Sequence, residues 1–482
     1  MMRQTKLKEE IMTARTKDTK LFHRLVNAQR KNNTDIDELD VGNKLFCGQE
    51  EVLMGFKEHF QNLATEKFNP NFDEKYNNIC KNEVKHIIEI AKQTDTYDVT
   101  VNEFKDALSL VNKGKSSDYY GLTIEHILHA EEVVIEYLLY IYNQIFSNGE
   151  TPDIIKTGLL TPAFKNKGNR TSSTSYRGIT VLPVLNKIME VILKLRIQPR
   201  VLSIQSPAQR GFTAKTFPLN TSFIIEELKR NAKDEKDILI TILLDAKSAF
   251  DVVNPEHLMR RLYHAGISNK IGTLIYSLHC NATSAIKWKG DISTFFDMKH
   301  EVRQGGILSA DLYKIYVNPL LEKLINTGIG SKVGDIICNT SACADDVTIN
   351  ATTESEAQIL LDIAADFAKQ ERYELQPSEA NTIRIKPSNR TSKGKPTHPL
   401  QLNGSDIPEV EEATHIGLKQ TDLISKTAEV NVENNIKKAR RATYSLMASG
   451  LHGQIGLDPE KSLQLVKTYI LPILLGNLFS RI

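Results

Sequence analysis

Apolar positions in this chain form separate runs and stripes whose spacing predicts both strands and helices. The run Ile238–Leu244 is apolar except at one position. A strand with one exposed face alternates apolar and polar residues, so this run predicts a central strand buried on both faces. Ile286 and Trp288 alternate with lysines ahead of Gly290-Asp291, and that pattern predicts a hairpin.

Helical spacing is equally clear. Asn254 is placed to cap a helix that begins at Pro255 and ends at Gly266. A second predicted helix is capped by Ser309 and interrupted near Pro319. Leu312, Ile315 and Tyr316 lie at helical spacing and support that helix. Three further sets at the same spacing predict other helices: Phe56, Phe60 and Leu63; Val184, Leu185, Ile188, Val191, Ile192 and Leu195; and Ile359, Leu360, Ile363, Ala364 and Phe367.

The segment around Asp345 predicts a strand, a tight turn and a second strand. Apolar residues lead into the turn and alternate after it, at Ala342, Cys343, Val347, Ile349 and Ala351. Strands and helices are mixed along the chain without a regular β-α-β repeat, so we predict an α+β fold.

Two neighbouring carboxylates, Asp345 and Asp346, lie in that turn. An Asp pair taken alone more often decorates an exposed turn. The apolar run Ile238–Leu244, however, ends on a third carboxylate, Asp245. Like charges brought together from strand ends need a cation between them, and oxygen ligands suit a hard divalent ion. Three such carboxylates are what two-metal phosphoryl chemistry requires.

Chain length limits the number of domains, and the distribution of charge indicates the class of partner. The 482 residues suffice for about three domains at roughly 150 residues each. A net charge of +2 hides basic stretches, which as charge runs are most often solvated faces. Beside a carboxylate cluster, three of them favour a bound polyanion. They are Lys156, Lys165, Lys167, Arg170, Arg177, Lys187, Lys194, Arg196 and Arg200; Arg384, Lys386, Arg390, Lys393 and Lys395; and Lys437, Lys438, Arg440 and Arg441.

Several classes of protein are disfavoured. The five cysteines include no C-x-x-C pair, so a disulfide framework and a zinc module are not indicated, and a reducing compartment fits best. The N-terminus lacks the apolar core of a signal peptide, and no apolar run approaches the ~20 residues of a membrane span. Gly328–Gly334 imitates a dinucleotide fingerprint, but its last glycine is one place late and a helix precedes it.

Six segments follow one another in a distinctive order: Tyr176–Glu190, Leu244–Asp251, Val302–Ser309, Cys343–Asp346, Leu402–Pro408 and His415–Leu418. The second, third and fourth resemble the A, B and C motifs of reverse transcriptases. The first resembles the fingers motif of the non-LTR retrotransposon class (LINE-like, jockey-type), and the last two resemble its post-palm hairpin and primer grip. Each motif alone is weak, but together they cover roughly residues 100–450 in the family's order.

The resemblance implies a right-hand polymerase with an antiparallel palm sheet packed on helices. The expected parts are an N-terminal helical extension at residues 1–95, fingers at 96–215, a palm at 216–418 and an incomplete thumb at 419–482, with the reverse transcriptase core at about 145–418. The implied reaction is RNA-directed addition of dNTPs to a primer 3′-hydroxyl with two Mg²⁺ ions, or Mn²⁺ in their place. The implied partners are an RNA template, a DNA primer and dNTPs, without a membrane. The implied compartment is the nucleus, with the cytoplasm as an additional location.

The family's roles map onto single residues. Asp245 and Asp345 would ligate both ions, Asp346 would be the third carboxylate, and the backbone oxygen of Ala246 would complete one shell. Phe250 would leave no room for a ribose 2′-hydroxyl and so select deoxynucleotides. Without Asp245 in register, a core aromatic would be the default interpretation of Phe250.

Other candidates concern the nucleotide and the duplex. Lys165 and Arg177 would hold the triphosphate, although lone basic residues are more often surface charges. Gln304 and Gly305 would lie against the nascent base pair and template backbone, although an ordinary turn would also use them. The basic cluster of Lys437, Lys438, Arg440 and Arg441 would bind the duplex backbone without reading sequence.

The chain also departs from the family pattern. Gly178 replaces a usual proline, Gly306 a usual aspartate or serine, and Ala310 a common proline. Glu379 lies where this class generally carries a lysine that protonates departing pyrophosphate. A glutamate with an ordinary pKa of ~4.3 is ionised near pH 7 and cannot donate that proton. Either Asn381 or Arg384 compensates, or this copy is impaired.

Two alternatives to an active reverse transcriptase stay open. The first is an impaired nucleic-acid-binding remnant. Glu379 favours it, and so does the expectation that this chain is a piece of an element, without the endonuclease, RNase H or zinc knuckle of longer proteins. The second is an RNA polymerase of the same palm architecture, which the bulk of Phe250 disfavours.

Overall fold

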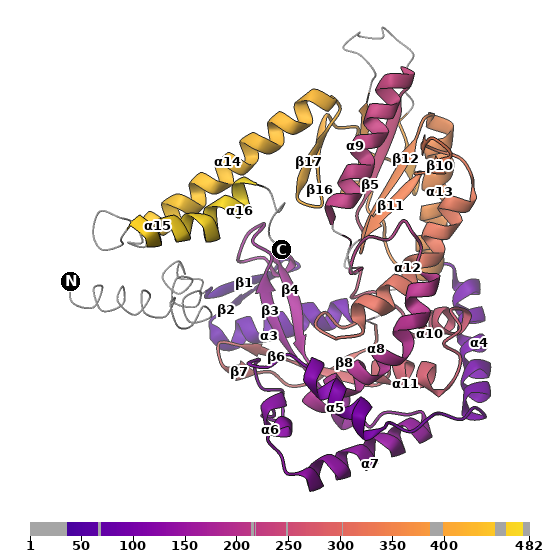
Figure 1. Cartoon of the computed structure of the whole chain (residues 1–482), viewed down its shortest axis with the longest axis vertical. Coiled ribbons are helices and arrows are strands. Elements are labelled where there is room, and N and C mark those ends of the chain that lie inside the picture. Colours follow the sequence, from indigo (N-terminus) through magenta and orange to yellow (C-terminus); the bar gives the residue numbers. More distant parts are fainter. Residues whose placement is uncertain are drawn as a thin grey trace. The chain divides into compact units, whose positions relative to one another are not determined.

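The computed structural model of the chain describes residues 36–65, 69–213, 216, 218–246, 249–300, 302–385, 399–448 and 459–475. The described residues fall into two compact units. The larger runs from Ile36 to Ile416, and the smaller comprises the described residues from Gly417 onward. The three aspartates therefore belong to the larger unit, and the basic cluster of residues 437–441 belongs to the smaller one (Figure 1).

Among the described residues, four antiparallel strands form the central sheet of the larger unit. Their order is β11 (Thr340–Cys343), β12 (Asp346–Ala351), β5 (Leu239–Leu244) and β13 (Asn381–Ile385). β5 lies inside this sheet and every one of its residues is buried. The predicted central strand and the predicted strand–turn–strand around Asp345 are therefore confirmed.

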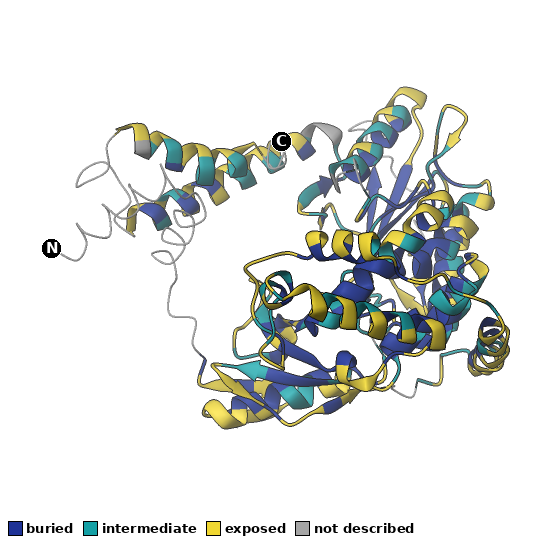
Figure 2. Cartoon of the chain, turned by 60° about the horizontal axis from the view of Figure 1, so that its bottom comes forward, coloured by how far each residue is buried: buried dark blue, intermediate teal, exposed yellow. Residues whose placement is uncertain are grey.

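Alternate residues of β5 explain why its sequence is continuously apolar. Ile240, Ile242 and Leu244 join the main core with α13 (Glu354–Glu371). Leu239 and Leu243 pack instead with side chains of α9 (Pro218–Glu235). Because side chains alternate across a strand, these two sets mark two covered faces of the sheet. Figure 2 shows the strands of the central sheet as mainly buried and the helices as buried mainly on one side.

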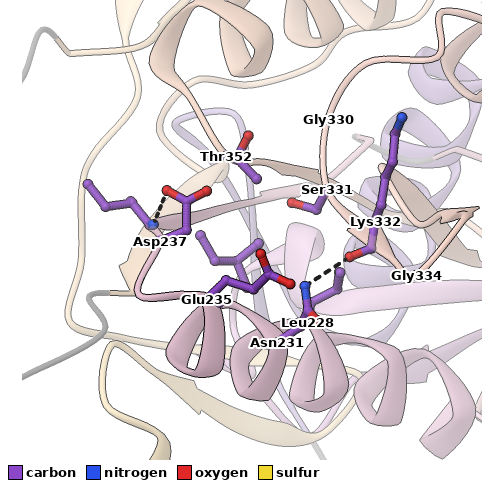
Figure 3. Close-up of a pocket in the computed structure, with 12 residues that line it drawn as sticks. Leu228, Asn231, Glu235, Asp237, Gly330, Ser331, Lys332, Gly334 and Thr352 are labelled. Atoms are coloured by element: carbon purple, nitrogen blue, oxygen red, sulfur yellow. Dashed lines mark hydrogen bonds between the residues drawn. The ribbon is translucent and has the colours of Figure 1, made fainter.

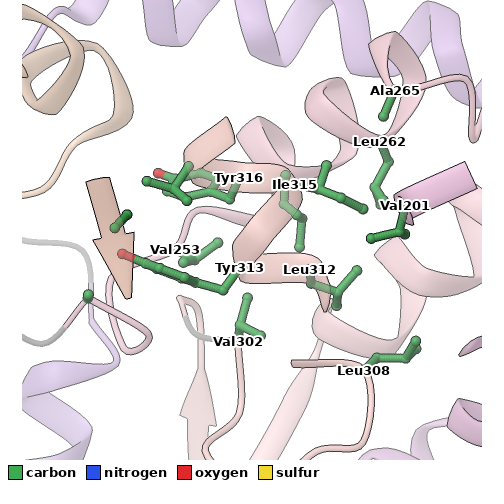
Figure 4. Close-up of a cluster of buried hydrophobic side chains, with 14 of the residues drawn as sticks. Val201, Val253, Leu262, Ala265, Val302, Leu308, Leu312, Tyr313, Ile315 and Tyr316 are labelled. Carbon is green, nitrogen blue, oxygen red and sulfur yellow. The ribbon is translucent and has the colours of Figure 1, made fainter. Parts of the chain in front are cut away.

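The helix α12 (Ser309–Asn326) supplies much of the main core and corrects two predictions (Figure 4). It continues through Pro319 to Asn326, so the predicted interruption was wrong. Burial along most of the helix outweighs the one backbone hydrogen bond that proline removes. Ser309 is its first residue and not its cap, because its hydroxyl donates to the Arg303 carbonyl at 2.7 Å.

Other predicted elements are confirmed. Asn254 caps α10 (Pro255–His264), accepting from the backbone N–H of Glu256 at 2.9 Å and of His257 at 3.1 Å. The hairpin at Gly290 joins β6 (Ala282–Trp288) and β7 (Asp291–Ile292). Helical spacing also identified the elements α3 (Gln49–Leu63), α8 (Val184–Ile204) and α13.

β6 belongs to a second sheet. Its strands follow the order β4 (Tyr176–Val181), β3 (Gly158–Phe164), β6 (Ala282–Trp288) and β7 (Asp291–Ile292), and β8 (Phe296–Met298) also pairs with β6. Phe56 and Phe60 of α3 pack on this sheet against Leu160. The hairpin of β1 (Glu38–Val41) and β2 (Lys44–Cys47) was not predicted, because strands this short carry too few residues to show a period.

The remaining elements complete an α+β fold, as predicted. In the larger unit they are α4 (Glu74–Lys92), α5 (Val101–Leu110), α6 (Ile124–Leu128), α7 (Glu132–Asn148), α11 (Lys270–His279), β9 (Lys332–Val333), β10 (Ile336–Ile337), β14 (Gln401–Leu402), β15 (Ser405–Asp406) and β16 (Glu412–His415); in the smaller unit they are β17 (Leu418–Thr421), α14 (Ile424–Ala448), α15 (Pro459–Leu465) and α16 (Leu471–Leu474). No helix in the described part of the chain is both long and apolar enough to cross a membrane. The basic positions 386, 390, 393 and 395 lie outside the described residues.

A buried charged network joins α4, α10 and α13. His257 Nδ1 lies 3.1 Å from a carboxylate oxygen of Glu371, and Arg261 donates to the other oxygen. His257 Nε2 lies 3.3 Å from the side-chain oxygen of Asn77 in α4. The side chains of His257 and Glu371 are fully buried. This network fixes α4 to α10 and α13.

Candidate active site

The register of the central sheet brings two distant aspartates together. β5 and β12 pair with Leu244 opposite Val347. One step further, the antiparallel register places Asp245 opposite Asp346 at the same end of the sheet. Asp345 immediately precedes Asp346 in the turn between β11 and β12. The fold thus gathers all three predicted carboxylates despite the hundred positions that separate them in sequence.

The three carboxylates also interact electrostatically. Burial, then the charges of Asp345 and Asp245, raises the pKa of Asp346 to about 6. Burial raises the pKa of Asp345, and the charge of Asp245 adds to that rise. Burial is the larger cause of both shifts, and the remainder reflects repulsion between the ionised carboxylates. A cation bound between the side chains would remove that cost.

The donor set suits a hard divalent cation. Carboxylate oxygens are the ligands that Mg²⁺ prefers, and Mg²⁺ usually keeps several waters and takes only one or two carboxylates from the protein. Across the described ranges, no three His, Cys, Asp or Glu side chains converge into a preformed cage. The three aspartates suit Mg²⁺ for two reasons: they supply carboxylate oxygens, and a bound cation would offset the repulsion between their negative charges. The backbone of Ala246, which pairs with Leu375, follows directly.

A fourth carboxylate, Glu379, lies on the other side of Asp245. β13 pairs with β5 so that Asn381 lies opposite Leu243, and Glu379 lies in the turn that leads into β13. After partial burial, the charge of Glu379 is the main cause that raises the pKa of Asp245. The residue that replaces the family's lysine therefore adds negative charge to the aspartate cluster.

The two residues considered as substitutes for that lysine have other contacts. Asn381 donates its side-chain amide to the Glu379 carbonyl at 3.1 Å. Arg384 is buried and pairs with Glu354 at 3.0 Å and with Glu409 at 3.3 Å. The guanidinium of Arg384 is thus already neutralised by two carboxylates.

Basic side chains face the aspartates from the loop after β3 and from β4. The charges of Lys167 and Lys165 oppose the rise in the pKa of Asp245, and that of Arg177 opposes the rise in the pKa of Asp345. Lys165 also donates to the Thr174 carbonyl at 2.8 Å, and partial burial lowers its pKa. Lys167 was not among the predicted site residues, although it lies in the same basic loop as Lys165.

Phe250 lies in an aromatic cluster beside the aspartates. Its ring stacks on Tyr313 with centroids 4.4 Å apart, and Phe212 meets it edge-on at 6.2 Å. The charges of Asp345 and Asp346 both act on the buried Tyr313 hydroxyl. The aromatic cluster and the carboxylate cluster are therefore neighbours, although Phe250 also serves in packing.

Gln304 and Gly305 attach their loop to the neighbouring strand. The Gln304 amide donates to Asp251 at 2.9 Å, and its carbonyl accepts from the Thr180 N–H at 2.8 Å. Gly305 has φ 124°, and a β-carbon there would lie 2.5 Å from the Thr180 carbonyl. Glycine is thus required at 305 by the approach of β4, a local reason that the sequence did not reveal.

The basic cluster lies on α14 in the smaller unit. Lys437, Lys438, Arg440 and Arg441 are exposed there, and Lys437 approaches Glu433 at 3.6 Å. Exposed lysine and arginine side chains on one helix suit contact with a phosphate backbone.

A cavity of about 330 Å³ occupies a different place (Figure 3). Glu235, Asp237 and Ser331 are among its lining residues. It lies at the start of β5, whereas the aspartate cluster follows the end of that strand. The cavity is therefore separate from the candidate active site.

Comparison with known proteins supports the interpretation of the motifs. Residues 164–388 match the family described as reverse transcriptase (RNA-dependent DNA polymerase). A Pol polyprotein from a type-2 retrotransposable element of Drosophila melanogaster is 26% identical over 257 residues, covering 53% of this chain and 24% of the relative. The probable RNA-directed DNA polymerase of the X-element transposon from the same species is 23% identical over 302 residues, covering 59% and 31%.

A third relative is the RNA-directed DNA polymerase from the mobile element jockey of Drosophila funebris. It is 22% identical over 336 residues, covering 66% of this chain and 35% of the relative. The chain thus spans only about a quarter to a third of the length of these three curated relatives.

Proposed function

We propose that this chain, as a member of the reverse transcriptase family, copies RNA into DNA. It is related to the enzymes of non-LTR retrotransposons. The reaction would be the addition of dNTPs to a primer 3′-hydroxyl on an RNA template. The observation that carries the proposal is the register of the central sheet, which brings Asp245 to the same end as Asp345 and Asp346, where the charges of the three carboxylates act on one another.

The aspartates would hold the catalytic ions. Two Mg²⁺ ions on Asp245, Asp345 and Asp346 would lower the pKa of the primer hydroxyl and neutralise charge on the leaving pyrophosphate. Lys165 and Arg177, whose charges reach the aspartates, would bind the triphosphate.

The same proposal assigns the parts of a right hand. The central sheet with α12 and α13 would be the palm within residues 216–418, and residues 96–215 would be the fingers. Residues 419–482 would be the thumb, where the exposed basic side chains of α14 would follow the duplex backbone. Residues 1–95 would precede them as an extension. The proposed compartment is the nucleus, where a DNA primer is present.

Primer extension tests the proposed function directly. With poly(rA)/oligo(dT), dTTP and Mg²⁺, the chain is expected to lengthen the primer and to require the divalent ion. Incorporation is measured on a sequencing gel, with EDTA as the control. No extension at any Mg²⁺ or Mn²⁺ concentration would favour the impaired remnant, for which Glu379 beside Asp245 is the specific supporting observation.

Phe250→Ala is expected to admit ribonucleotides. Removing the ring opens space for a 2′-hydroxyl, and one such pocket contact is worth about 10- to 100-fold in discrimination. The measurement is the ratio of kcat/KM for dTTP and UTP, with Phe250→Tyr as the control that keeps the bulk. Lost stacking on Tyr313 would lower both rates alike, so an unchanged ratio would assign Phe250 to packing alone.

Glu379→Lys is expected to raise the rate of extension by about tenfold or more. The substitution removes the charge that opposes ionisation of Asp245 and supplies a proton donor for pyrophosphate, a role generally worth 10²–10⁴-fold. Glu379→Gln is the matched control, because it removes the charge without adding a donor and should gain less. If the single-turnover rate of Glu379→Lys stays level or falls, the hypothesis that Glu379 impairs primer extension is refuted.

A further inference from the structure

The turn that presents Asp345 has an unusual backbone. Ala344, the residue before Asp345, has φ 62°. This is a left-handed backbone conformation that residues other than glycine rarely adopt. Such a residue keeps this conformation only where its surroundings determine it. The direction of the Asp345 carboxylate therefore depends on whatever holds Ala344.

A single buried side chain holds both backbone polar groups of Ala344. The side-chain oxygen of Gln209 accepts from the Ala344 N–H at 2.9 Å, and its amide nitrogen donates to the Ala344 carbonyl at 3.3 Å. The same oxygen accepts from the Gly211 N–H at 2.8 Å. Gln209 is only 2% exposed, so water does not compete for these bonds.

The backbone around Gln209 is itself fixed to the central sheet. Ala342 of β11 donates to the Ala208 carbonyl at 2.9 Å and accepts from the Arg210 N–H at 2.7 Å. Gly211 comes so close to the turn that a β-carbon there would lie 2.3 Å from the Ala344 nitrogen. Segment 208–211 therefore packs directly against the turn, and only glycine fits at position 211.

We propose that Gln209, supported by Gly211, is a positioning residue for the catalytic cation site. It sets the conformation of Ala344 and through it the placement of Asp345. Glutamine suits this task because its amide both accepts and donates, whereas an ionised glutamate only accepts. The proposal deepens the proposed function, because its catalytic readout presumes primer extension.

Gln209→Met tests the proposal, since methionine keeps the length and loses the hydrogen bonds. The Ala344 amide should exchange with solvent faster, as measured by hydrogen exchange without metal. Loss of a residue that orients a metal ligand costs about 10- to 100-fold in metal affinity, so the Mg²⁺ concentration for half-maximal extension should rise about tenfold. The KM for dTTP should stay within about twofold, because the side chain of Gln209 is buried and has almost no exposed surface with which to contact a nucleotide.

Two further variants control the experiment. Gly211→Ala should reproduce the altered Mg²⁺ dependence, because its β-carbon displaces Ala344. Asn350→Leu removes an equally buried amide of β12, which binds the Cys338 carbonyl at 3.2 Å and Thr241 at 3.1 Å. Asn350 lies near the end of β12 that is opposite to Asp346. Loss of its amide should therefore lower stability without changing the Mg²⁺ dependence.

The outcomes separate this proposal from the proposed function. Unchanged exchange at Ala344 in Gln209→Met, or faster exchange with an unchanged Mg²⁺ requirement, would overturn the role of Gln209. If the wild-type chain extends no primer, the proposed function fails, and Mn²⁺ binding followed by electron paramagnetic resonance replaces the catalytic readout. Weaker Mn²⁺ binding by Gln209→Met than by Asn350→Leu would then still support the positioning role, and equal binding would refute it.

Discussion

Asp345→Asn is expected to abolish primer extension, lowering kcat by about 1,000-fold or more. The substitution keeps the size of the side chain and removes one negative charge from the cluster that would hold both cations. Asp345 is partly buried and interacts with the charges of Asp346 and Asp245, so the substitution removes charge from within the cluster. The measurement is the single-turnover rate on an RNA template at saturating Mg²⁺.

Asp335→Asn is the matched control for that experiment. Asp335 is an exposed aspartate in the turn between β9 and β10, so its loss should leave the rate within about twofold, as for most surface substitutions. Thermal unfolding of both variants would show that neither fold is lost. Extension that survives Asp345→Asn would remove that residue from the cation site.

Glu371→Gln is expected to lower the free energy of unfolding by about 3–5 kcal/mol, the usual cost of removing one partner from a buried ion pair. Glutamine leaves the buried His257 and the nearby Arg261 without their counter-charge. The measurement is urea unfolding followed by circular dichroism. Glu58→Gln is the control, because the Glu58–Lys44 pair is exposed and such pairs are worth only about 0–1 kcal/mol.

The same network predicts how stability depends on pH. Burial alone would lower the pKa of His257, but hydrogen bonds with Cys80 and Glu371 raise it to about 9. Its contribution is therefore complete below the unfolded pKa of ~6.5 and is lost as the pH rises through 9. Burial alone would raise the pKa of Glu371, but His257 and Arg261 lower it to about 2. Its contribution is complete above ~4.5 and is lost as the pH falls through 2.

The network's contribution to stability should therefore be largest between about pH 4.5 and 6.5. The difference in unfolding free energy between wild type and Glu371→Gln, measured across this range and up to pH 9, should shrink toward alkaline pH. A difference that is constant from pH 5 to 9 would mean that Glu371 does not raise the pKa of His257 in the folded chain.

Local elements were largely predictable because their signals are local. The cap at Asn254, the apolar run ending at Leu244 and the alternation after Asp346 each specify an element without help from distant residues. The prediction of a break at Pro319 failed because tertiary burial of α12 outweighed a local preference. A period could not reveal β1 and β2, which are each four residues long.

The site was only partly predictable. The meeting of Asp245 with Asp346 depends on the register of β5 and β12, which spacing along the chain does not encode; the motif resemblance supplied that expectation. The effect of Glu379 on Asp245 depends on the turn that leads into β13, which packs beside β5. The contacts of Gln209 with Ala344 span 135 positions, so no local pattern could have identified them.

Mn²⁺ binding to variants of the two aspartates tests the central claim most directly, namely that Asp245 and Asp345 belong to one cation site. Free Mn²⁺ would be followed by electron paramagnetic resonance with the wild type, Asp245→Asn, Asp345→Asn and the double variant. We expect each single substitution to weaken Mn²⁺ binding by about tenfold or more. The double variant should lose less binding free energy than the sum of the two, since neighbours in one site are coupled. Unchanged Mn²⁺ binding in Asp245→Asn, alongside weakened binding in Asp345→Asn, would contradict the central claim.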